Sequence, residues 1–110
     1  MITTHVLDTS IGRPGAAIAV ELERIEQGVW HLVGGGVTDA DGRLRTLTPE
    51  GPVHPGTYRI RFQTAAYFAA RRVDGFFPVV EIQFTVVDGA QHHHVPLLLS
   101  PYGFSTYRGS

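Results

Sequence analysis

The stretch YRIRFQ at residues 58–63 alternates apolar with polar side chains. Because successive side chains of a β-strand point to opposite faces, this alternation predicts a strand with one buried and one solvated face. The same period of two recurs through most of the chain. The rows that it predicts to face inward are Ala16, Ile18, Val20 and Leu22; Tyr58, Ile60 and Phe62; Val80, Ile82, Phe84 and Val86; and Val95, Leu97 and Leu99.

Shorter segments lie between these rows. Trp30 and Leu32 continue the alternation up to a break at residues 34–36, which are all glycine. The sequence DADG at residues 39–42 predicts a turn, and a short strand is expected after it at Leu44–Leu47. These segments continue the all-β pattern between the row at residues 16–22 and the row at residues 58–62.

Only one segment has helical character. Ala65–Arg72 is rich in alanine and follows Thr64, a residue type typical of a helix N-cap. A last short strand is predicted at Phe104–Arg108. Seven or eight short strands at regular spacing with one small helix indicate an all-β fold, a β-sandwich, in a single domain spanning residues 1–110.

The composition excludes several kinds of chemistry. All nine basic residues are arginine, and the net charge of -1 gives no electrostatic attraction to nucleic acid or to anionic membranes. The absence of lysine and cysteine excludes Schiff-base chemistry, thiol nucleophiles, disulfides and thiolate metal sites. No apolar stretch approaches the ~20 residues that span a bilayer. Since no targeting segment is visible either, a cytoplasmic protein is expected.

Three consecutive histidines, residues 92–94, open the strand that carries the row from Val95 onward. Alternation puts His93 on the same face as Val95, and it puts His92 and His94 on the opposite face. That second face is polar at its beginning and apolar further on, which is typical of a protein–protein surface with a polar pocket at one end. A solvated loop leading into the strand is an equally open interpretation of the same residues.

The two ends of the chain carry more specific motifs. Residues 5–14, HVLDTSIGRP, resemble the amino-terminal signature of the transthyretin-like family. Residues 92–101, HHHVPLLLSP, followed by STYRGS at residues 105–110, are similar to its carboxy-terminal signature. The ending YRGS marks the enzyme branch of that family, the 5-hydroxyisourate hydrolases, as distinct from the hormone-carrying transthyretins. The resemblance covers essentially the whole chain.

The resemblance implies an architecture and an activity. It implies an eight-stranded transthyretin-like sandwich that forms a homotetramer, with active sites in clefts where pairs of dimers meet. The implied reaction is hydrolysis of 5-hydroxyisourate, the immediate product of urate oxidation, by water that opens the six-membered ring. The implied mechanism uses no metal and no other cofactor, and the only partners are the small-molecule substrate and further copies of the chain.

The resemblance also places the site on particular residues. The expected catalytic residues are His5, Arg45, His94 and Ser110, and the expected substrate-binding residues are His5, Arg45, Tyr107 and His92. We expect His94 to be the general base, because imidazole titrates near neutrality, at a pKa of about 6.5. His5 would orient His94 or share the proton transfer. The guanidinium of Arg45 would stabilise charge on the attacked carbonyl.

Two positions depart from the family pattern, and two other functions stay open. Gly15 stands where alanine is common, and His93 stands where tyrosine is more usual; we expect both to change packing more than chemistry. Two histidines two residues apart, with a third elsewhere, also form a reasonable ligand set for a catalytic zinc. The other alternative is a non-catalytic carrier of an aromatic small molecule, which would have no use for a water-activating cluster.

Overall fold

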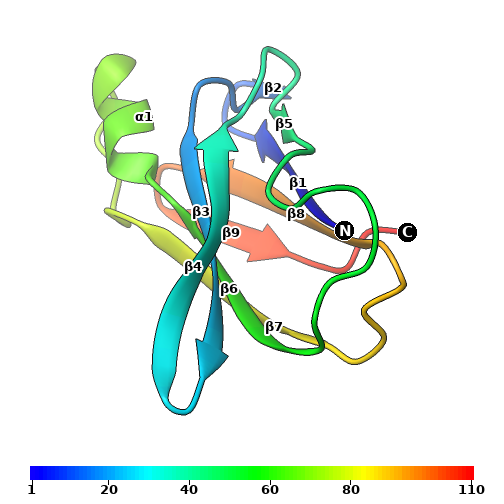
Figure 1. Ribbon diagram of the computed structural model, residues 1–110. Helices are drawn as coiled ribbons and strands as arrows, with labels where there is room; N and C mark the ends of the chain where they lie inside the picture. The colour runs from blue at the N-terminus through cyan, green and yellow to red at the C-terminus, as the bar shows by residue number, and fades with distance from the viewer.

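The computed structural model describes residues 1–110 and contains two β-sheets packed face to face, with one helix at the end away from the chain termini (Figure 1). The first sheet consists of β1 (Ile2–Asp8), β2 (Arg13–Pro14), β5 (Arg43–Leu44), β8 (His93–Ser100) and β9 (Gly103–Thr106). The second sheet consists of β3 (Ala19–Glu26), β4 (Val29–Val37), β6 (Gly56–Phe62) and β7 (Val80–Val86). The predicted all-β sandwich with one short helix is therefore confirmed, and β2 and β5 are strands of only two residues each.

Strand pairing brings the two ends of the sequence together. The first sheet has the order β2-β1-β8-β9 with β5 also beside β1, and the second has the order β4-β3-β6-β7. The pair β1–β8 is parallel, with Ile2 opposite His93 and Asp8 opposite Leu99, whereas the other pairs are antiparallel. The amino-terminal and carboxy-terminal segments consequently lie side by side, and the two chain ends are close together in Figure 1.

A core of 17 buried hydrophobic residues fills the space between the sheets. Almost every residue of the predicted inward rows belongs to it. Phe84 is only half-buried and stacks on Tyr58 with ring centroids 5.8 Å apart, and Ala16 lies ahead of the first residue of β3. Each large side chain removed from water contributes about 1.5–3 kcal/mol. Because the inward residues form the core, the outward residues of the same strands are available for other functions.

Strand β4 differs from the sequence-based expectation. Residues 34–36 do not break the strand, because β4 continues through them to Val37. A Cβ atom at Gly34 would collide with the main-chain oxygen of Leu47, so glycine lets the segment after β5 cross closely over β4. Leu32 is 68% exposed and not part of the core, because β4 is an edge strand whose outer side nothing covers.

Helix α1 (Thr64–Ala70) is shorter than predicted and begins differently. Thr64 is its first helical residue, not its N-cap, and its Oγ1 donates a hydrogen bond to the main-chain oxygen of Phe77 at 2.8 Å. Gln63 occupies the cap position without a side-chain hydrogen bond. The helix ends before Arg72, which has a φ of 58° in the left-handed region. With only seven residues, α1 is too short to cross a membrane.

Two predicted strands have different bounds. The strand expected at 44–47 is β5, at residues 43–44, and Leu47 beyond it is buried as part of a loop. The strand expected at 104–108 is β9, at residues 103–106. β5 ends at Leu44, the last of its residues that pairs with β1, and β9 ends at Thr106, the last of its residues that pairs with β8. Alternation alone does not reveal where such pairing stops.

A buried carboxylate fastens α1 to the end of β1. The side chain of Asp8 accepts hydrogen bonds from Tyr67 Oη and from Arg71 Nη1, each at 2.7 Å, and from the main-chain N–H of Ser10. Burial alone would raise the pKa of Asp8, but the hydrogen bonds from Ser10 and Tyr67 and the charge of Arg71 lower it overall. Burial and the bond to Asp8 raise the pKa of Tyr67 to about 12.

Candidate active site

The three consecutive histidines at the start of β8 and just before it point to alternate faces of the sheet, as predicted. His93 is 5% exposed and lies on the core side of β8, with Nδ1 donating to the main-chain oxygen of Gln91 at 2.9 Å. His92, which directly precedes β8, is exposed, and His94 is half-buried; both imidazoles contact Thr3 on the outer side of the first sheet. His93 therefore contributes to packing in the sandwich interior, whereas the imidazoles of His92 and His94 are available to a ligand.

An outer cavity of about 270 Å³ lies over this end of the first sheet. It combines residues from both ends of the chain with residues that surround β5. Its lining residues are Met1, Thr3, Thr4, Arg43, Arg45, His92, His94 and Ser110. Four of the six predicted site residues are among them: Arg45, His92, His94 and Ser110. The fold thus gathers most of the predicted site in one place.

Thr3 is the residue that joins the two outward histidines. Its Oγ1 lies 2.7 Å from Nε2 of His92 and 2.8 Å from Nδ1 of His94. The parallel register places Thr3 directly opposite His94, and the Thr3 side chain is almost fully buried, at 3% exposure. Nε2 of His94 makes no hydrogen bond within the chain, so this nitrogen is left for a ligand or a water molecule.

The surroundings of His94 favour its neutral form. Burial is the largest cause that lowers the pKa of His94, and the nearby His92, His5 and Arg43 lower it further. A histidine that stays neutral keeps a lone pair for accepting a proton. The environment of His94 therefore suits a general base that works near neutral pH.

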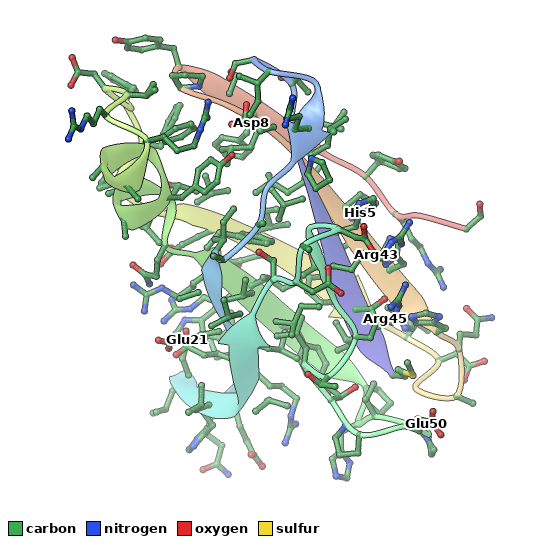
Figure 2. The ribbon with its side chains drawn as sticks, turned by 90° about the horizontal axis from the view of Figure 1, so that it is seen from above. His5, Asp8, Glu21, Arg43, Arg45 and Glu50 are labelled. Atoms are coloured by element: carbon green, nitrogen blue, oxygen red, sulfur yellow. The ribbon has the colours of Figure 1, made fainter.

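Two arginines beside β1 have no ion-pair partner. Arg43 is opposite His5 in the β1–β5 pair, and Arg45 follows shortly after β5. Neither guanidinium forms an ion pair with a carboxylate of the chain. Figure 2 shows His5, Arg43 and Arg45 on the same side of the molecule, beside β1. Planar guanidinium groups of this kind bind carbonyl and carboxylate oxygens well.

His5 lies next to the cavity without lining it. Its Nε2 is 3.0 Å from the main-chain oxygen of Asp41, an acceptor, so Nε2 carries a proton. This bond fixes the ring against the turn at 39–42. His5 still affects the site electrostatically, since it is among the charges that lower the pKa of His94.

The carboxy-terminal segment closes one wall of the cavity. The Gly109 N–H donates to the main-chain oxygen of His94 at 2.8 Å, and Arg108 donates to the side chain of Gln91 at 3.0 Å. A Cβ atom at Gly109 would lie 2.7 Å from Cδ2 of His94, which is closer than two such atoms approach. Glycine at this position lets the chain pass against the imidazole and delivers Ser110 to the cavity.

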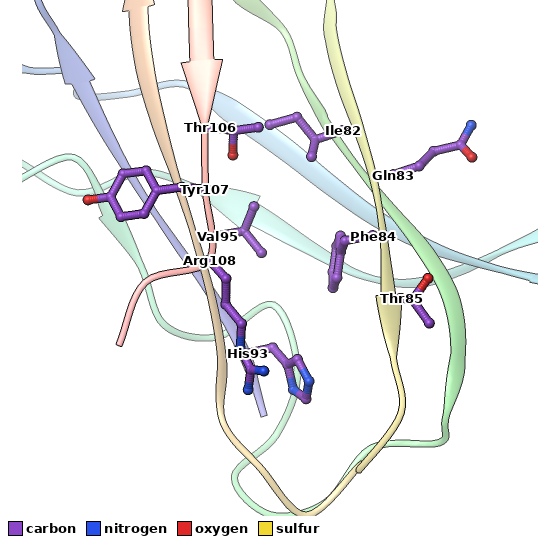
Figure 3. Close-up of a pocket in the computed structure, with 9 residues that line it drawn as sticks. All are labelled: Ile82, Gln83, Phe84, Thr85, His93, Val95, Thr106, Tyr107 and Arg108. Atoms are coloured by element: carbon purple, nitrogen blue, oxygen red, sulfur yellow. The ribbon is translucent and has the colours of Figure 1, made fainter.

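Tyr107 is the predicted site residue that the fold leaves outside the outer cavity. It is 58% exposed and instead borders a second cavity of about 250 Å³ between β7 and β9, to which His93 also contributes. Figure 3 shows its ring directed away from Ile82 and Phe84. Within one chain, Tyr107 therefore does not line the cavity beside His94.

Sequence reasoning missed three residues of this site. Thr3 shares a strand face with His5 at a spacing of two, which is a usable signal, but its link to the histidines requires the parallel β1–β8 pairing. Arg43 lies between the predicted turn at 39–42 and the predicted strand at 44–47, and nothing in the sequence assigned it a role. Gly109 belongs to the YRGS motif, yet its contact with the His94 ring is visible only in three dimensions.

The residues of the chain do not fit a zinc site. No group of three or more histidine, cysteine, aspartate or glutamate side chains is arranged to hold a metal ion. His92 and His94 instead share the hydroxyl of Thr3. A catalytic zinc needs three protein ligands, so the zinc interpretation lacks its third ligand.

Comparisons with known proteins match this fold over nearly its whole length. A model described as the HIUase/Transthyretin family matches residues 2–109. The 5-hydroxyisourate hydrolase of Salmonella typhimurium is 43% identical over 110 residues, which are 100% of this chain and 81% of that protein.

Two solved structures have the same architecture. The 5-hydroxyisourate hydrolase of Klebsiella pneumoniae superimposes with a TM-score of 0.85 at 35% identity, covering 99% of this chain and 98% of that one. Sea bream transthyretin in complex with thyroxine superimposes with a TM-score of 0.91 at 31% identity, covering 98% and 93% of the two chains. An enzyme and a transthyretin therefore share this fold, and the site residues must distinguish them.

Proposed function

Because the chain belongs to the HIUase/transthyretin family, we propose that it is an enzyme that hydrolyses 5-hydroxyisourate in the degradation of urate. The product is 2-oxo-4-hydroxy-4-carboxy-5-ureidoimidazoline. The reaction needs a water molecule to lose a proton, a carbonyl oxygen to carry negative charge, and a ring nitrogen to gain a proton as its bond to carbon breaks.

One observation carries the proposal: His94 presents a free Nε2 at a cavity that also holds two unpaired guanidiniums. Its Nδ1 is bonded to Thr3, and burial lowers its pKa, so the ring is neutral and ready to accept a proton. Arg43 and Arg45 line the same cavity. A neutral imidazole beside two guanidiniums without ion-pair partners provides the base and the positive charge that the attack of water on a carbonyl requires.

We assign the roles as follows. His94 deprotonates the attacking water through Nε2, and Arg45 stabilises the oxygen of the attacked carbonyl. His5 holds the neighbouring turn and biases His94 towards its neutral form. Ser110 and His92 line the cavity and contact the substrate or the water.

Assembly completes the site in this proposal. The chain forms a homotetramer in which the outer face of the first sheet is covered by another protomer, and the open cavity becomes enclosed there. Tyr107 supports this arrangement, because its exposed ring does not reach the cavity of its own chain. Its expected contact with substrate then requires a protomer-to-protomer interface.

A spectroscopic assay tests the activity. Freshly generated 5-hydroxyisourate has an ultraviolet absorbance whose decay should accelerate with enzyme concentration. Sizing by light scattering in the same buffer should give the mass of four chains. Activity that disappears with a chelator and returns with zinc would instead support a metal mechanism. The expected cytoplasmic location is a separate prediction, tested by cell fractionation.

The carrier alternative is favoured by one comparison, the likeness to sea bream transthyretin in complex with thyroxine. A carrier would bind an aromatic ligand at the same outer face without converting it. Turnover distinguishes the two functions. Saturable binding of 5-hydroxyisourate with no accelerated decay would favour a carrier, and many turnovers for each chain would favour the hydrolase.

A further inference from the structure

We propose that Thr3 is a positioning residue that sets the tautomers of His92 and His94 and relays a proton between them. This inference rests on the proposed hydrolase function and extends it to a residue that the family motifs did not indicate. Its basis is a short hydrogen-bonded chain, His92 Nε2, Thr3 Oγ1 and His94 Nδ1, with links of 2.7 and 2.8 Å.

A threonine hydroxyl has one proton, and this limits how the chain can be arranged. The buried Thr3 hydroxyl has no other acceptor within the chain, so its proton goes to one of the two ring nitrogens and its oxygen accepts from the other. Two neutral histidines then have only two permitted states. In one, His94 carries its proton on Nδ1 and His92 on Nδ1; in the other, both carry it on Nε2.

The first state prepares His94 as a base. Nδ1–H of His94 donates to Thr3, the Thr3 hydroxyl donates to Nε2 of His92, and Nε2 of His94 keeps its lone pair for water. The second state prepares His94 as an acid, because Nε2 then holds a proton that faces the cavity. Switching between the states therefore turns one residue from base to acid.

The relay moves protons without adding or losing any. When Nε2 of His94 takes a proton from water, the Nδ1 proton passes to Thr3 while the Thr3 proton passes to Nε2 of His92. His94 is neutral again, and the positive charge is on His92, which also borders a separate cavity beside Gln91 and Arg108 and releases its Nδ1 proton to water there. Reversing the sequence, His94 gives its Nε2 proton to the leaving ring nitrogen and His92 recovers one from solvent.

The charges around His94 make this relay useful. Arg43 and Arg45 line the same cavity as His94, and His5 lies beside it. None of these groups would stabilise a positive charge on the half-buried ring of His94. His92 is the more exposed of the two histidines, so water can stabilise its imidazolium. Thr3 gives the proton a path from the half-buried imidazole of His94 to the more exposed imidazole of His92.

Nitrogen NMR of the whole protein tests the tautomers directly. In protein labelled with ¹⁵N-histidine, without substrate and above the pH at which free imidazole titrates, His94 should show a protonated Nδ1 and an unprotonated Nε2. In Thr3→Val this preference should be lost and both tautomers should appear, whereas Thr3→Ser should keep the wild-type signals. An Nε2–H tautomer of His94 in the wild type, or an unchanged spectrum in Thr3→Val, would overturn the proposal.

Kinetics supply the second readout. Thr3→Val should lower kcat by roughly ten- to a hundredfold with little change in KM, which is less than the loss of the general base itself would cost, and Thr3→Ser should restore kcat to near the wild-type value. Thermal unfolding of both variants shows whether each is folded. Equal kcat in folded Thr3→Val and wild type would overturn the relay. Wild-type protein with the expected tautomers but no turnover would instead overturn the hydrolase function.

Discussion

On the outer face of the β4-β3-β6-β7 sheet, glutamates neutralise the arginines. Arg59 pairs with Glu23 at 2.9 Å, and its guanidinium also lies 4.3 Å from the centroid of the Trp30 ring. On the outer face of the other sheet, Arg43 and Arg45 have no carboxylate partner and stand beside imidazoles. The comparison indicates that paired arginines hold strands together, whereas unpaired ones remain available to an oxygen-rich ligand.

The largest expected effect comes from His94. Replacing His94 by alanine removes the proposed base and should lower kcat/KM by about two to four powers of ten, measured by the ultraviolet decay of 5-hydroxyisourate. The matched control is His93→Tyr, a change at the adjacent histidine that faces the core. The control should keep its activity. A fully active His94→Ala enzyme would rule out the assigned base.

The arginine comparison has its own pair of variants. Arg45→Ala should lower kcat/KM by about two to three powers of ten, as for loss of an oxyanion donor, with little change in Tm. Arg59→Ala should leave kcat/KM unchanged and lower Tm, because it breaks a structural ion pair and leaves Glu23 with only the longer contact to Arg61, at 3.9 Å. Calorimetry and the hydrolysis assay measure both quantities. If the two variants behave alike, the difference between the faces has no functional meaning.

Gly109 tests how closely the terminal segment positions His94. A methyl group at this position would meet Cδ2 of His94 at 2.7 Å and displace the ring. We expect Gly109→Ala to lower kcat/KM by about tenfold to a hundredfold, since small misplacements of a catalytic group are costly. Gly103→Ala is the control, because its Cβ would meet nothing closer than 3.7 Å. Normal activity in Gly109→Ala would show that the contact is incidental.

Asp8 stabilises the fold at the end of β1, whereas Thr3 and His5 of the same strand belong to the proposed active site. Asp8→Asn should cost about 1–3 kcal/mol of unfolding free energy, because charged hydrogen bonds to Tyr67 and Arg71 are lost, while kcat/KM stays near wild type. The folded pKa of Asp8 is lowered, so its contribution is complete above about pH 4 and is lost as pH falls below that value. Denaturant titrations at several pH values measure this, and an equally steep acid loss in Asp8→Asn would contradict it.

The smallest effect is a shift of the pH profile. Burial, with His92, His5 and Arg43 adding to it, lowers the pKa of His94, and the base acts only when neutral. Activity should therefore persist to lower pH than a free imidazole allows, with the acid limb of kcat/KM centred below about 6.5. Arg43→Ala should move that limb to higher pH. A midpoint above 6.5 in the wild type would contradict the assignment.

The sequence predicted the fold class and the orientation of the histidines because both depend on a local period of two. The inward rows built on Val20, Ile60 and Val95 are buried, and His93 is separated from its neighbours as expected. The bounds of α1 and β4 were wrong where distant contacts decide them. Thr64 bonds to Phe77 and does not cap the helix. Gly34 stays in a strand because it pairs with Leu22 of β3, and glycine is needed there because Leu47 crosses closely over it.

The hydrolase assignment followed from motifs at both ends of the chain, and the relatives confirm it. The individual roles of His5, Arg45, His94, Tyr107 and Ser110 stay predictions. The structure brings Arg45, His94 and Ser110 to one cavity, places His5 beside it, and leaves Tyr107 outside it within a single chain.

Amino-acid order alone determined which side chains leave each strand on the core side and which chemistry the composition permits. The tertiary structure decided which strands are neighbours. Only the parallel contact of β1 with β8 puts the Thr3 hydroxyl between two imidazoles, and only the return of the terminal segment sets Gly109 against the His94 ring. Strand periodicity is a property of adjacent residues, whereas such distances depend on chain segments that meet after the core has formed.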